Sequence, residues 1–305
     1  MTFPVITVLP DSSTQLEQLG TKAKFWYQFD ADQKALFKEG RPGTGENWAE
    51  KVCCELARAL GLPHAEYDLG LWRGKKGVIS PSLVPKNGRL ILGNELLAWV
   101  DKSYEAAARY KTTQHILRRV IAVLQQPSIG IPTGWDCPHQ VSDAVGVFAG
   151  YLLLDALVCN QDRHHENWGL IATPEHGLTL AQTFDHASSL GRNETDETRR
   201  SRLNTKDKGY SVESYVAKAR SGFFENKSST KAMSTMDAFS ECAKANADAA
   251  QYWLDRLYAI NEADFSAILT QVPDDFISSE ARDFSNAMLC INRNRLLSLN
   301  GTRQT

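Results

Sequence analysis

The sequence has no long basic block, no CxxC cysteine pair and no leader-like start. Its formal net charge of −2 gives no support to a face that neutralises phosphates, so direct nucleic-acid binding is not expected. The first residues, MTFPVITVLPDSST, carry no positive region ahead of an apolar stretch and are not expected to act as a secretory signal. Six cysteines diluted over 305 residues favour free thiols in a reducing cytoplasm over a disulfide framework.

Long apolar runs are missing as well. The most apolar segment, residues 144–159, is shorter than a bilayer span requires, and it contains Asp155. We therefore expect a buried core helix there and no membrane span. The sequence also shows no internal repeat, no heptad run and no low-complexity segment. Its composition, 42% hydrophobic and 23% charged, is that of an ordinary globular protein.

The first hundred residues combine strand-like runs with one helix. Residues 23–29 and 34–39 flank a short turn and predict a hairpin. The segment GTGENWAEKVCCELARALGLP predicts a helix, because its apolar residues recur at helical spacing and Gly61 and Pro63 follow as a stop signal. Two further strand-like pieces come next, at residues 66–72 and 76–84.

From about residue 93 the pattern becomes helical. Helical periodicity covers roughly 93–125, 142–159 and, in several pieces, 211–300. Residues 167–173 and 178–184 interrupt it as a hairpin around the turn PEHG. The sequence therefore predicts an α+β fold of two lobes, a small β-rich lobe (residues 1–92) and a larger, mostly α-helical lobe (residues 93–305).

The stretch NQDRHHENWG, residues 160–169, follows the apolar helix directly. Because the hairpin turns near residue 175, its outer ends, which carry Asn167 and Asp185, are expected to lie side by side. Asp162 sits in the loop that leaves the helix, close to the same place. Carboxylate and amide oxygens are ligands that suit Mg²⁺. The sequence therefore predicts a magnesium site formed by Asn167 and Asp185.

The spacing Asp-x-x-x-x-Asn, with another Asp one hairpin later, is used for phosphoryl transfer in kinases. Asp162 would accept the proton of the attacking hydroxyl, while Asn167 and Asp185 hold Mg²⁺ against the nucleotide phosphates. A kinase also needs a lysine on a strand and an acid on the following helix. Lys38 and Glu50 occur in that order.

Other predicted nucleotide contacts lie on both sides of that strand lysine. A phosphate-covering turn is expected before it, although QLGTKAKFW supplies a single glycine. The nucleotide base is expected against the linker between the lobes, and His164 beneath the polar loop, where its hydrogen bonds would hold the backbone of Asp162. These further cofactor-binding candidates are Gly20, Thr21, Lys22, Ser80, Ser82, Leu83 and His164.

Simpler interpretations exist for the same residues. Asp162 and Asn167 could cap a helix end and a turn, and Glu50 could close a capping box with Asn47. The histidines near the loop suggest zinc hydrolysis, but adjacent His164 and His165 would point apart, which disfavours a shared metal. Asp155 on an apolar helix is expected to brace the polar loop by hydrogen bonds, with an ordinary surface acid as the alternative. Trp168 is expected to be core.

The chain resembles the HipA-like serine/threonine kinases of bacteria, especially the compact members that lack the extra N-terminal subdomain. The resemblance is carried by LLLDALVCNQDRHHENWGLI and FDHASSLG, and is reinforced by LFKEG, NWAEKVCCELARALGLP and GRLILGNELL. It extends loosely to INRNRLL near the C-terminus. It implies a bilobed kinase-like fold, ATP and Mg²⁺ as cofactors, and transfer of the γ-phosphate to a Ser or Thr of a protein substrate.

Two departures from the family pattern bear on regulation. Several members phosphorylate a Ser in the phosphate-covering loop, whereas Thr21 is the hydroxyl found here. Full-length HipA partners a DNA-binding antitoxin and owns a subdomain that this chain is expected to lack, so a small antitoxin or regulatory partner, or none, remains open. The resemblance implies a cytoplasmic bacterial protein. A toxin, a secreted effector and a housekeeping kinase all stay compatible with the sequence.

Two other functions share these motifs. A small-molecule or phosphoinositide-type lipid kinase would carry a similar Asp-Arg-His and Asn pattern, but a basic membrane-facing loop is not evident. Residues 191–208 mix arginines and lysines with four acids and are interpreted as an activation-loop-like segment, mobile until it engages the phosphoacceptor. A nucleotide-binding pseudokinase is the third hypothesis, against which the intact set of Asp162, Asn167 and Asp185 argues.

Overall fold

A mixed sheet of six strands forms the amino-terminal part of the protein. It is seen in a computed structural model that describes residues 2–10, 15–16, 24–31, 33–108 and 112–301. The strand order is β1-β5-β6-β4-β3-β2, with β1 parallel to β5 and the other pairs antiparallel. The strands are β1 (Val5–Val8), β2 (Gln15–Leu16), β3 (Lys24–Gln28), β4 (Lys34–Glu39), β5 (Asp68–Trp72) and β6 (Lys75–Pro81).

The predicted hairpin at residues 23–29 and 34–39 is confirmed as β3 and β4. Phe25 pairs with Phe37 across it, and both rings are buried. Together with Tyr27, Ala35 and other buried side chains they form a small core on this sheet. β4 is therefore a buried central strand, which fixes the direction of each side chain along it.

Helix α1 (Glu46–Leu60) follows this hairpin in sequence and packs against β5 and β6 on one side and α4, α8 and α9 on the other. It ends as predicted at Gly61, whose φ of 78° suits glycine. Its N-cap is Gly45, with no side-chain cap. The alternative interpretation of Glu50, a capping box with Asn47, is therefore wrong, because the helix begins at Glu46 and both residues lie inside it.

The second sheet belongs to the helical part of the chain. Its order is β7-β9-β10-β8, formed by β7 (Arg89–Leu92), β8 (Ile129–Gly130), β9 (Gly169–Thr173) and β10 (Gly177–Leu180). The predicted hairpin around PEHG is confirmed as β9 and β10, which pair Leu170 with Leu180 at its open end. β7, which lies before the predicted lobe boundary at residue 92, pairs with β9 in this sheet.

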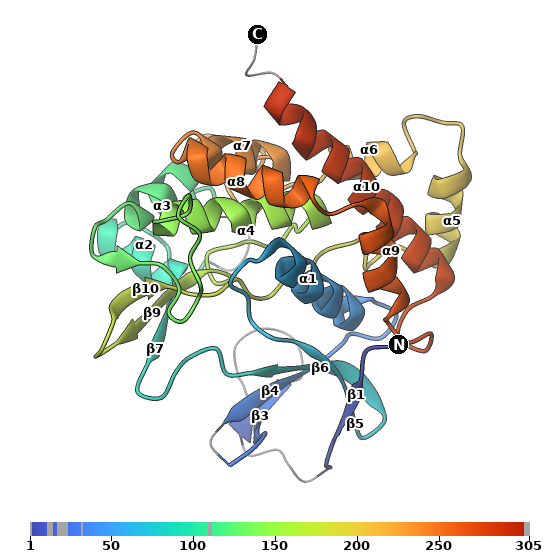
Figure 1. Cartoon of the computed structure of the whole chain (residues 1–305), viewed down its shortest axis with the longest axis horizontal. Coiled ribbons are helices and arrows are strands. Elements are labelled where there is room, and N and C mark those ends of the chain that lie inside the picture. The colour runs from blue at the N-terminus through green and yellow to red at the C-terminus, as the bar shows by residue number, and fades with distance from the viewer. Residues whose placement is uncertain (1, 11–14, 17–23, 32, 109–111, 302–305) are drawn as a thin grey trace.

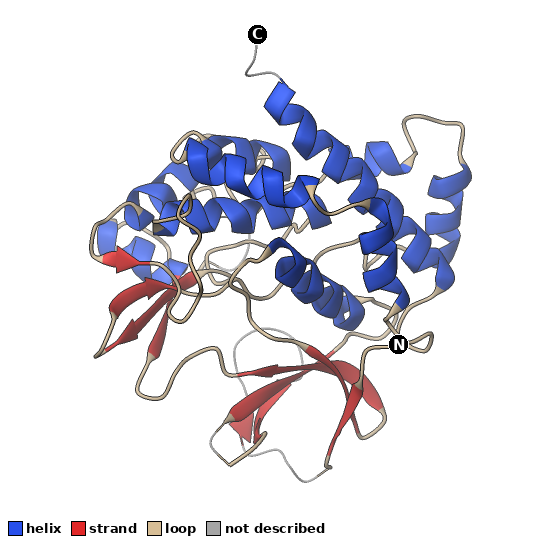
Figure 2. Ribbon diagram, viewed as in Figure 1, coloured by secondary structure: helices blue, strands red, loops and turns tan. Residues whose placement is uncertain are grey.

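The remaining described chain is mostly helical. Helix α4 lies at its centre with every side chain buried, as expected for residues 144–159, and packs against α7, α8 and α10 (Figure 1). Figure 2 shows the two groups of strands below this mass of helices. The helices are α2 (Gly93–Val100), α3 (Leu117–Leu124), α4 (Ala144–Val158), α5 (Asp196–Asn204), α6 (Val212–Ala217), α7 (Thr235–Ala243), α8 (Ala247–Tyr258), α9 (Glu262–Thr270) and α10 (Ser279–Gly301).

The predicted α+β class, with a sheet at the amino-terminal end and helices beyond it, is confirmed. Two details differ. The helical signal at 93–125 is divided into α2 and α3 by a connecting segment. The charged segment 191–208, interpreted as an activation-loop-like mobile stretch, contains α5. Among the helices of the described residues, none is both long and apolar enough to cross a bilayer.

Candidate active site

The polar loop (residues 160–168) begins where α4 ends. Cys159 adopts a left-handed backbone conformation with a φ of 54°, which is uncommon for a residue other than glycine. The side chain of Asn292, on α10, donates hydrogen bonds to the carbonyl of Leu157 and to Cys159 Sγ, each at 3.0 Å. Helix α10 therefore holds the turn from which the loop departs.

A buried ion pair anchors this loop. Arg163 Nε lies 2.8 Å from Asp155 Oδ2, and Arg163 Nη2 lies 2.8 Å from Asp155 Oδ1. The same guanidinium donates to the carbonyl of Asn167 and to Thr183 Oγ1, each at 2.9 Å. The prediction that Asp155 braces the loop is confirmed. Because Thr183 follows β10, Arg163 also joins the polar loop to the segment that leaves the hairpin.

Asp162 is held by its neighbours in the loop. Its amide donates to Asn160 Oδ1 at 3.1 Å, and its carbonyl accepts from Asn167 Nδ2 at 2.7 Å. Its carboxylate accepts a hydrogen bond from Ser188 Oγ at 3.3 Å and lies 3.7 Å from His164 Nε2. The bracing of the Asp162 backbone, predicted for His164, thus comes from two asparagine side chains, with a further contact from the His164 amide at 2.7 Å.

Asp185, after β10, and Lys38, on β4, meet in the same site. Asp185 has a φ of 58°, and its amide donates to the hydroxyl of Tyr67 at 3.2 Å. Lys38 Nζ, from β4, lies 3.4 Å from Asp185 Oδ2 and 5.5 Å from the centroid of the Tyr67 ring. A left-handed backbone at an acidic residue stores strain, and such strain clusters at functional sites.

Glu50 lies behind this pair, on α1. Its side chain is 1% exposed, and its Oε1 atom accepts a hydrogen bond of 2.6 Å from the amide of His186. Burial alone would lower the pKa of Lys38, but Asp185, Tyr67 and Glu50 together outweigh it and raise that pKa. Glu50 therefore supports the charge of Lys38, and it also ties α1 to the residue that follows Asp185.

A cavity of about 530 Å³ collects most of the predicted site residues. One wall is apolar and includes Leu36, Leu90, Leu92 and Phe184. Glu50 is not part of the lining, and Gly20, Thr21 and Lys22 lie outside the described residues. The predicted residues that do line the cavity are Lys38, Ser80, Ser82, Leu83, Asp162, His164, Asn167 and Asp185.

The acidic side of this cavity suits a divalent cation. Burial raises the pKa of Asp162, and the nearby Asp185 carboxylate raises it further, although His164 and Ser188 act in the opposite direction. Two nearby carboxylates repel each other, and a cation bound by both would remove that repulsion. Asn167 adds an amide to the same wall. The set of oxygen donors therefore fits Mg²⁺.

The histidines do not form a shared metal site. The rings of His164 and His165 stand at 89° to each other, with centroids 6.2 Å apart. His165 Nδ1 lies 2.6 Å from the hydroxyl of Tyr104, and His186 Nε2 lies 2.8 Å from Thr183 Oγ1. Both are buried, as is Trp168, which confirms the expectation that this tryptophan belongs to the core. His165 and His186 thus make hydrogen bonds to protein side chains, Tyr104 and Thr183.

Several cavity residues were missed by the sequence analysis. Arg41 Nη1 lies 3.1 Å from Glu46 Oε1, and Arg192 pairs with the same carboxylate. Arg192 Nη2 also donates a hydrogen bond of 2.9 Å to Ser188 Oγ, the hydroxyl that contacts Asp162. Arg192 follows directly on FDHASSLG, and that position was the available signal. Two guanidinium groups therefore line the same cavity as the acidic residues.

Gly222 is a further residue that the sequence did not single out. A Cβ atom there would lie 2.4 Å from the carbonyl oxygen of Arg163 and 2.8 Å from the amide of His164. We expect Gly222→Ala to displace the polar loop and to lower the free energy of unfolding by about 1–3 kcal/mol, the usual effect of overpacking. Urea denaturation measures this. Gly40→Ala, whose nearest contact is a side-chain atom at 3.4 Å, is the matched control, and equal effects in both variants would contradict the prediction.

The comparisons with known proteins bear on the fold. No protein-family model and no curated protein matches the chain. Among solved structures, the Helicobacter pylori proinflammatory kinase CtkA aligns with a TM-score of 0.75 and 19% identity over 98% of both chains. HipA of a Shewanella oneidensis MR-1 toxin-antitoxin system, in complex with HipB and operator DNA, aligns with a TM-score of 0.56 and 10% identity over 95% of this chain and 66% of its own. The resemblance is thus confirmed for the fold, which is that of the HipA-like kinases.

Proposed function

We propose that this protein is an ATP- and Mg²⁺-dependent phosphotransferase that transfers the γ-phosphate of ATP to a Ser or Thr of another protein. The observation that carries the proposal is the meeting of Lys38, Asp162, Asn167 and Asp185 in one cavity. They come from β4, the polar loop and the segment after β10. Together they supply the groups that phosphoryl transfer requires, which are a lysine for the phosphates, a base and two metal ligands. The kinase-like fold supports the same reaction.

Asp162 is the proposed base. The acceptor hydroxyl forms a bond to the γ-phosphorus, the bond from that phosphorus to the bridging oxygen of ADP breaks, and the hydroxyl proton passes to the Asp162 carboxylate. Ser188 Oγ, at 3.3 Å from Asp162 Oδ2, marks where an acceptor hydroxyl can approach that carboxylate. The bond from Ser188 orients Asp162 before the substrate arrives.

Asn167 and Asp185 are the proposed magnesium ligands. Bound Mg²⁺ supplies positive charge that neutralises the phosphate oxygens. The chain itself holds Asp185 through Tyr67 and holds the loop of Asn167 through Arg163. These bonds fix the backbone of both residues, which limits the reorganisation of the chain on nucleotide binding.

The nucleotide base is proposed to occupy the apolar wall. Leu36, Leu83, Leu90 and Phe184 offer a slot of the kind that takes a flat ring, next to the linker after β6. At the linker, Ser82 donates its amide to the carbonyl of Lys34 at 2.9 Å, so the linker continues the sheet edge. The phosphates then extend toward Lys38 and the acidic wall.

The direct test is incubation of the full chain with Mg²⁺ and γ-labelled ATP, alone and with a cell extract. Label on a protein, absent when Asp162 is replaced by Asn, supports the proposal. Label confined to a small-molecule or lipid fraction would instead identify a small-molecule or lipid kinase. Binding of ATP, seen as thermal stabilisation, without any turnover would identify a nucleotide-binding module.

Lys38 is proposed to contact the nucleotide phosphates. We expect Lys38→Met to weaken ATP binding or turnover by roughly 10- to 100-fold, because a hydrogen bond to a charged group contributes about 1.5–3 kcal/mol. Lys34→Met, at the exposed start of the same strand β4, is the matched control and is expected to leave both unchanged. Isothermal titration with ATP and steady-state kinetics measure the two effects. Comparable losses in both variants would refute a phosphate contact by Lys38.

A small regulatory partner is a separate proposal. It rests on the likeness to HipA, whose structure contains HipB. Copurification of the full chain with the product of a neighbouring gene would support it, and the outcome does not affect the assignment of the cavity.

A further inference from the structure

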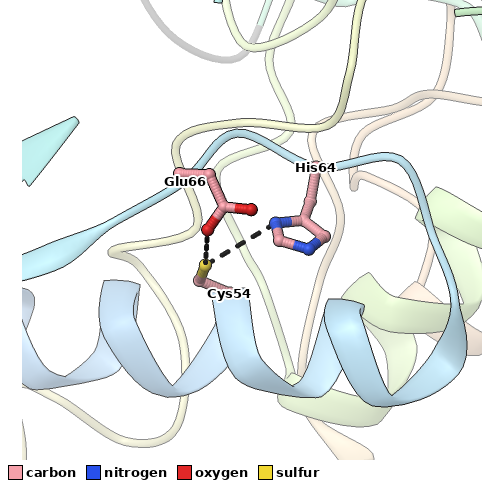
Figure 3. Close-up of side chains that lie close together, drawn as sticks. All are labelled: Cys54, His64 and Glu66. Carbon is pink, nitrogen blue, oxygen red and sulfur yellow. Dashed lines mark hydrogen bonds between the residues drawn. The ribbon is translucent and has the colours of Figure 1, made fainter. Parts of the chain in front are cut away.

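Three side chains with metal-binding chemistry gather outside the proposed active site. Cys54 projects from α1, and His64 and Glu66 lie on the segment that leads from this helix to β5 (Figure 3). Cys54 Sγ lies 3.6 Å from His64 Nδ1 and 3.9 Å from Glu66 Oε2. The three ligand atoms all lie within 4.8 Å of one another. Within the part of the chain that the structure describes, this is the one such group of three or more His, Cys, Asp or Glu side chains.

We propose that Cys54, His64 and Glu66 form a binding site for a soft divalent cation of the Zn²⁺ type. A thiolate, an imidazole and a carboxylate are ligands that such an ion accepts, and a water completes a tetrahedron. Bonds of about 2.3 Å to sulfur and about 2.0 Å to nitrogen or oxygen place tetrahedral ligand atoms roughly 3.5 Å apart. The distance from sulfur to nitrogen already matches, and the distance from sulfur to the carboxylate oxygen, 3.9 Å, is a few tenths of an ångström longer.

The surroundings of the ligands favour binding of a metal over chance proximity. Cys54 is 1% exposed, whereas Glu66 is 53% exposed in its side chain, so the site is rooted in the core and open on one side. His64 is half-buried, with its Nδ1 atom beside the thiol.

Arg58 is the competitor for this site. Its Nη1 and Nη2 atoms lie 3.1 Å and 2.5 Å from the Glu66 oxygens, and Nη2 lies 3.8 Å from Cys54 Sγ. The Arg58 side chain is 48% exposed, so it can turn outward into water when a cation arrives. The guanidinium therefore occupies the place of the cation in the metal-free protein, and its removal is expected to strengthen metal binding.

A cation bound at this site would join α1 to the segment between α1 and β5, and both of these elements contact residues next to the cavity. Cys54 lies one turn after Glu50 on α1. His64 bridges to Thr183, and the amide of Ala65 donates to the Thr183 carbonyl at 2.9 Å. A bound cation would therefore fasten α1 to the segment that supports the strand end before Asp185. The proposal goes beyond phosphotransfer and does not rest on it.

Titration of the full chain with Co²⁺ as a spectroscopic probe tests the site, followed by displacement with Zn²⁺. We expect one equivalent to bind with a near-ultraviolet band from thiolate to metal. The band is expected to be lost in Cys54→Ser and kept in Cys137→Ser, a partly exposed thiol far along the chain. Arg58→Ala is expected to bind up to about fivefold tighter, because it removes a half-exposed ion pair.

Glu66→Gln protects the test against a folding defect in the cysteine variant, since it keeps the volume of a half-exposed side chain. It is expected to weaken Co²⁺ binding at unchanged free energy of unfolding in metal-free buffer. A thiolate band that persists in Cys54→Ser would overturn the proposal. So would the absence of any such band in the parent chain and in Arg58→Ala.

Discussion

Asp162→Asn is expected to lower the rate of phosphate transfer by a factor of roughly 10² to 10⁴, the usual contribution of a positioned general base. The substitution keeps the shape of the side chain and the backbone bonds to Asn160 and Asn167. It removes the oxygen charge that accepts the hydroxyl proton. ATP binding is therefore expected to persist, because the apolar wall and Lys38 are unchanged. Single-turnover kinetics with γ-labelled ATP separates the two quantities.

Asp248→Asn provides the comparison for a carboxylate without a role in the cavity. This residue is exposed in the first turn of α8, outside the cavity lining. The Asp248→Asn variant is expected to be as active as the parent chain. If Asp162→Asn retained full turnover, the base would have to be sought elsewhere. Asp185→Asn would then show whether the remaining carboxylate of the cavity is required.

The parts of the site that the sequence predicts are those linked by short segments. Asp162 and Asn167 share one loop, and a tight hairpin brings Asp185 to them, so local spacing is enough to place all three. Lys38 could be predicted for a similar reason, since its strand is half of a predicted hairpin. In a hairpin, the alternation of side chains along each strand and the residues of the turn determine which side chains lie close together.

The missed residues depend on contacts between distant segments. Glu46 and Arg192 are 146 positions apart, and neither has a local pattern that reveals their pairing. Gly222 matters because backbone from another region of the chain passes against it. Helix α5, within residues 191–208, was missed for another reason. Its start carries a local signal that the interpretation as an activation-loop-like segment left unused, since Thr195 caps α5 and Asp196 and Glu197 complement the helix dipole.

The buried pair of Arg163 and Asp155 gives the second large effect. We expect Asp155→Ala to lower the free energy of unfolding by about 3–5 kcal/mol, because it leaves an arginine charge in the core without its carboxylate. The two side chains are 1% and 3% exposed, so water cannot replace the lost partner. Urea denaturation followed by circular dichroism measures the change. Arg89→Ala, which breaks an exposed pair with Glu95, is the control and is expected to cost no more than about 1 kcal/mol.

A double variant separates stability from positioning. Replacing Asp155 by Leu and Arg163 by Met removes both charges at similar volume, and apolar replacements of buried ion pairs are often neutral or stabilising. We expect most of the unfolding free energy to return, while phosphate transfer stays low. The reason is that Arg163 also donates to the Asn167 carbonyl and to Thr183, and no apolar side chain can hold the polar loop against the hairpin in that way. Recovery of activity together with stability would show that packing alone positions Asp162, and that the ion pair contributes nothing beyond filling the core.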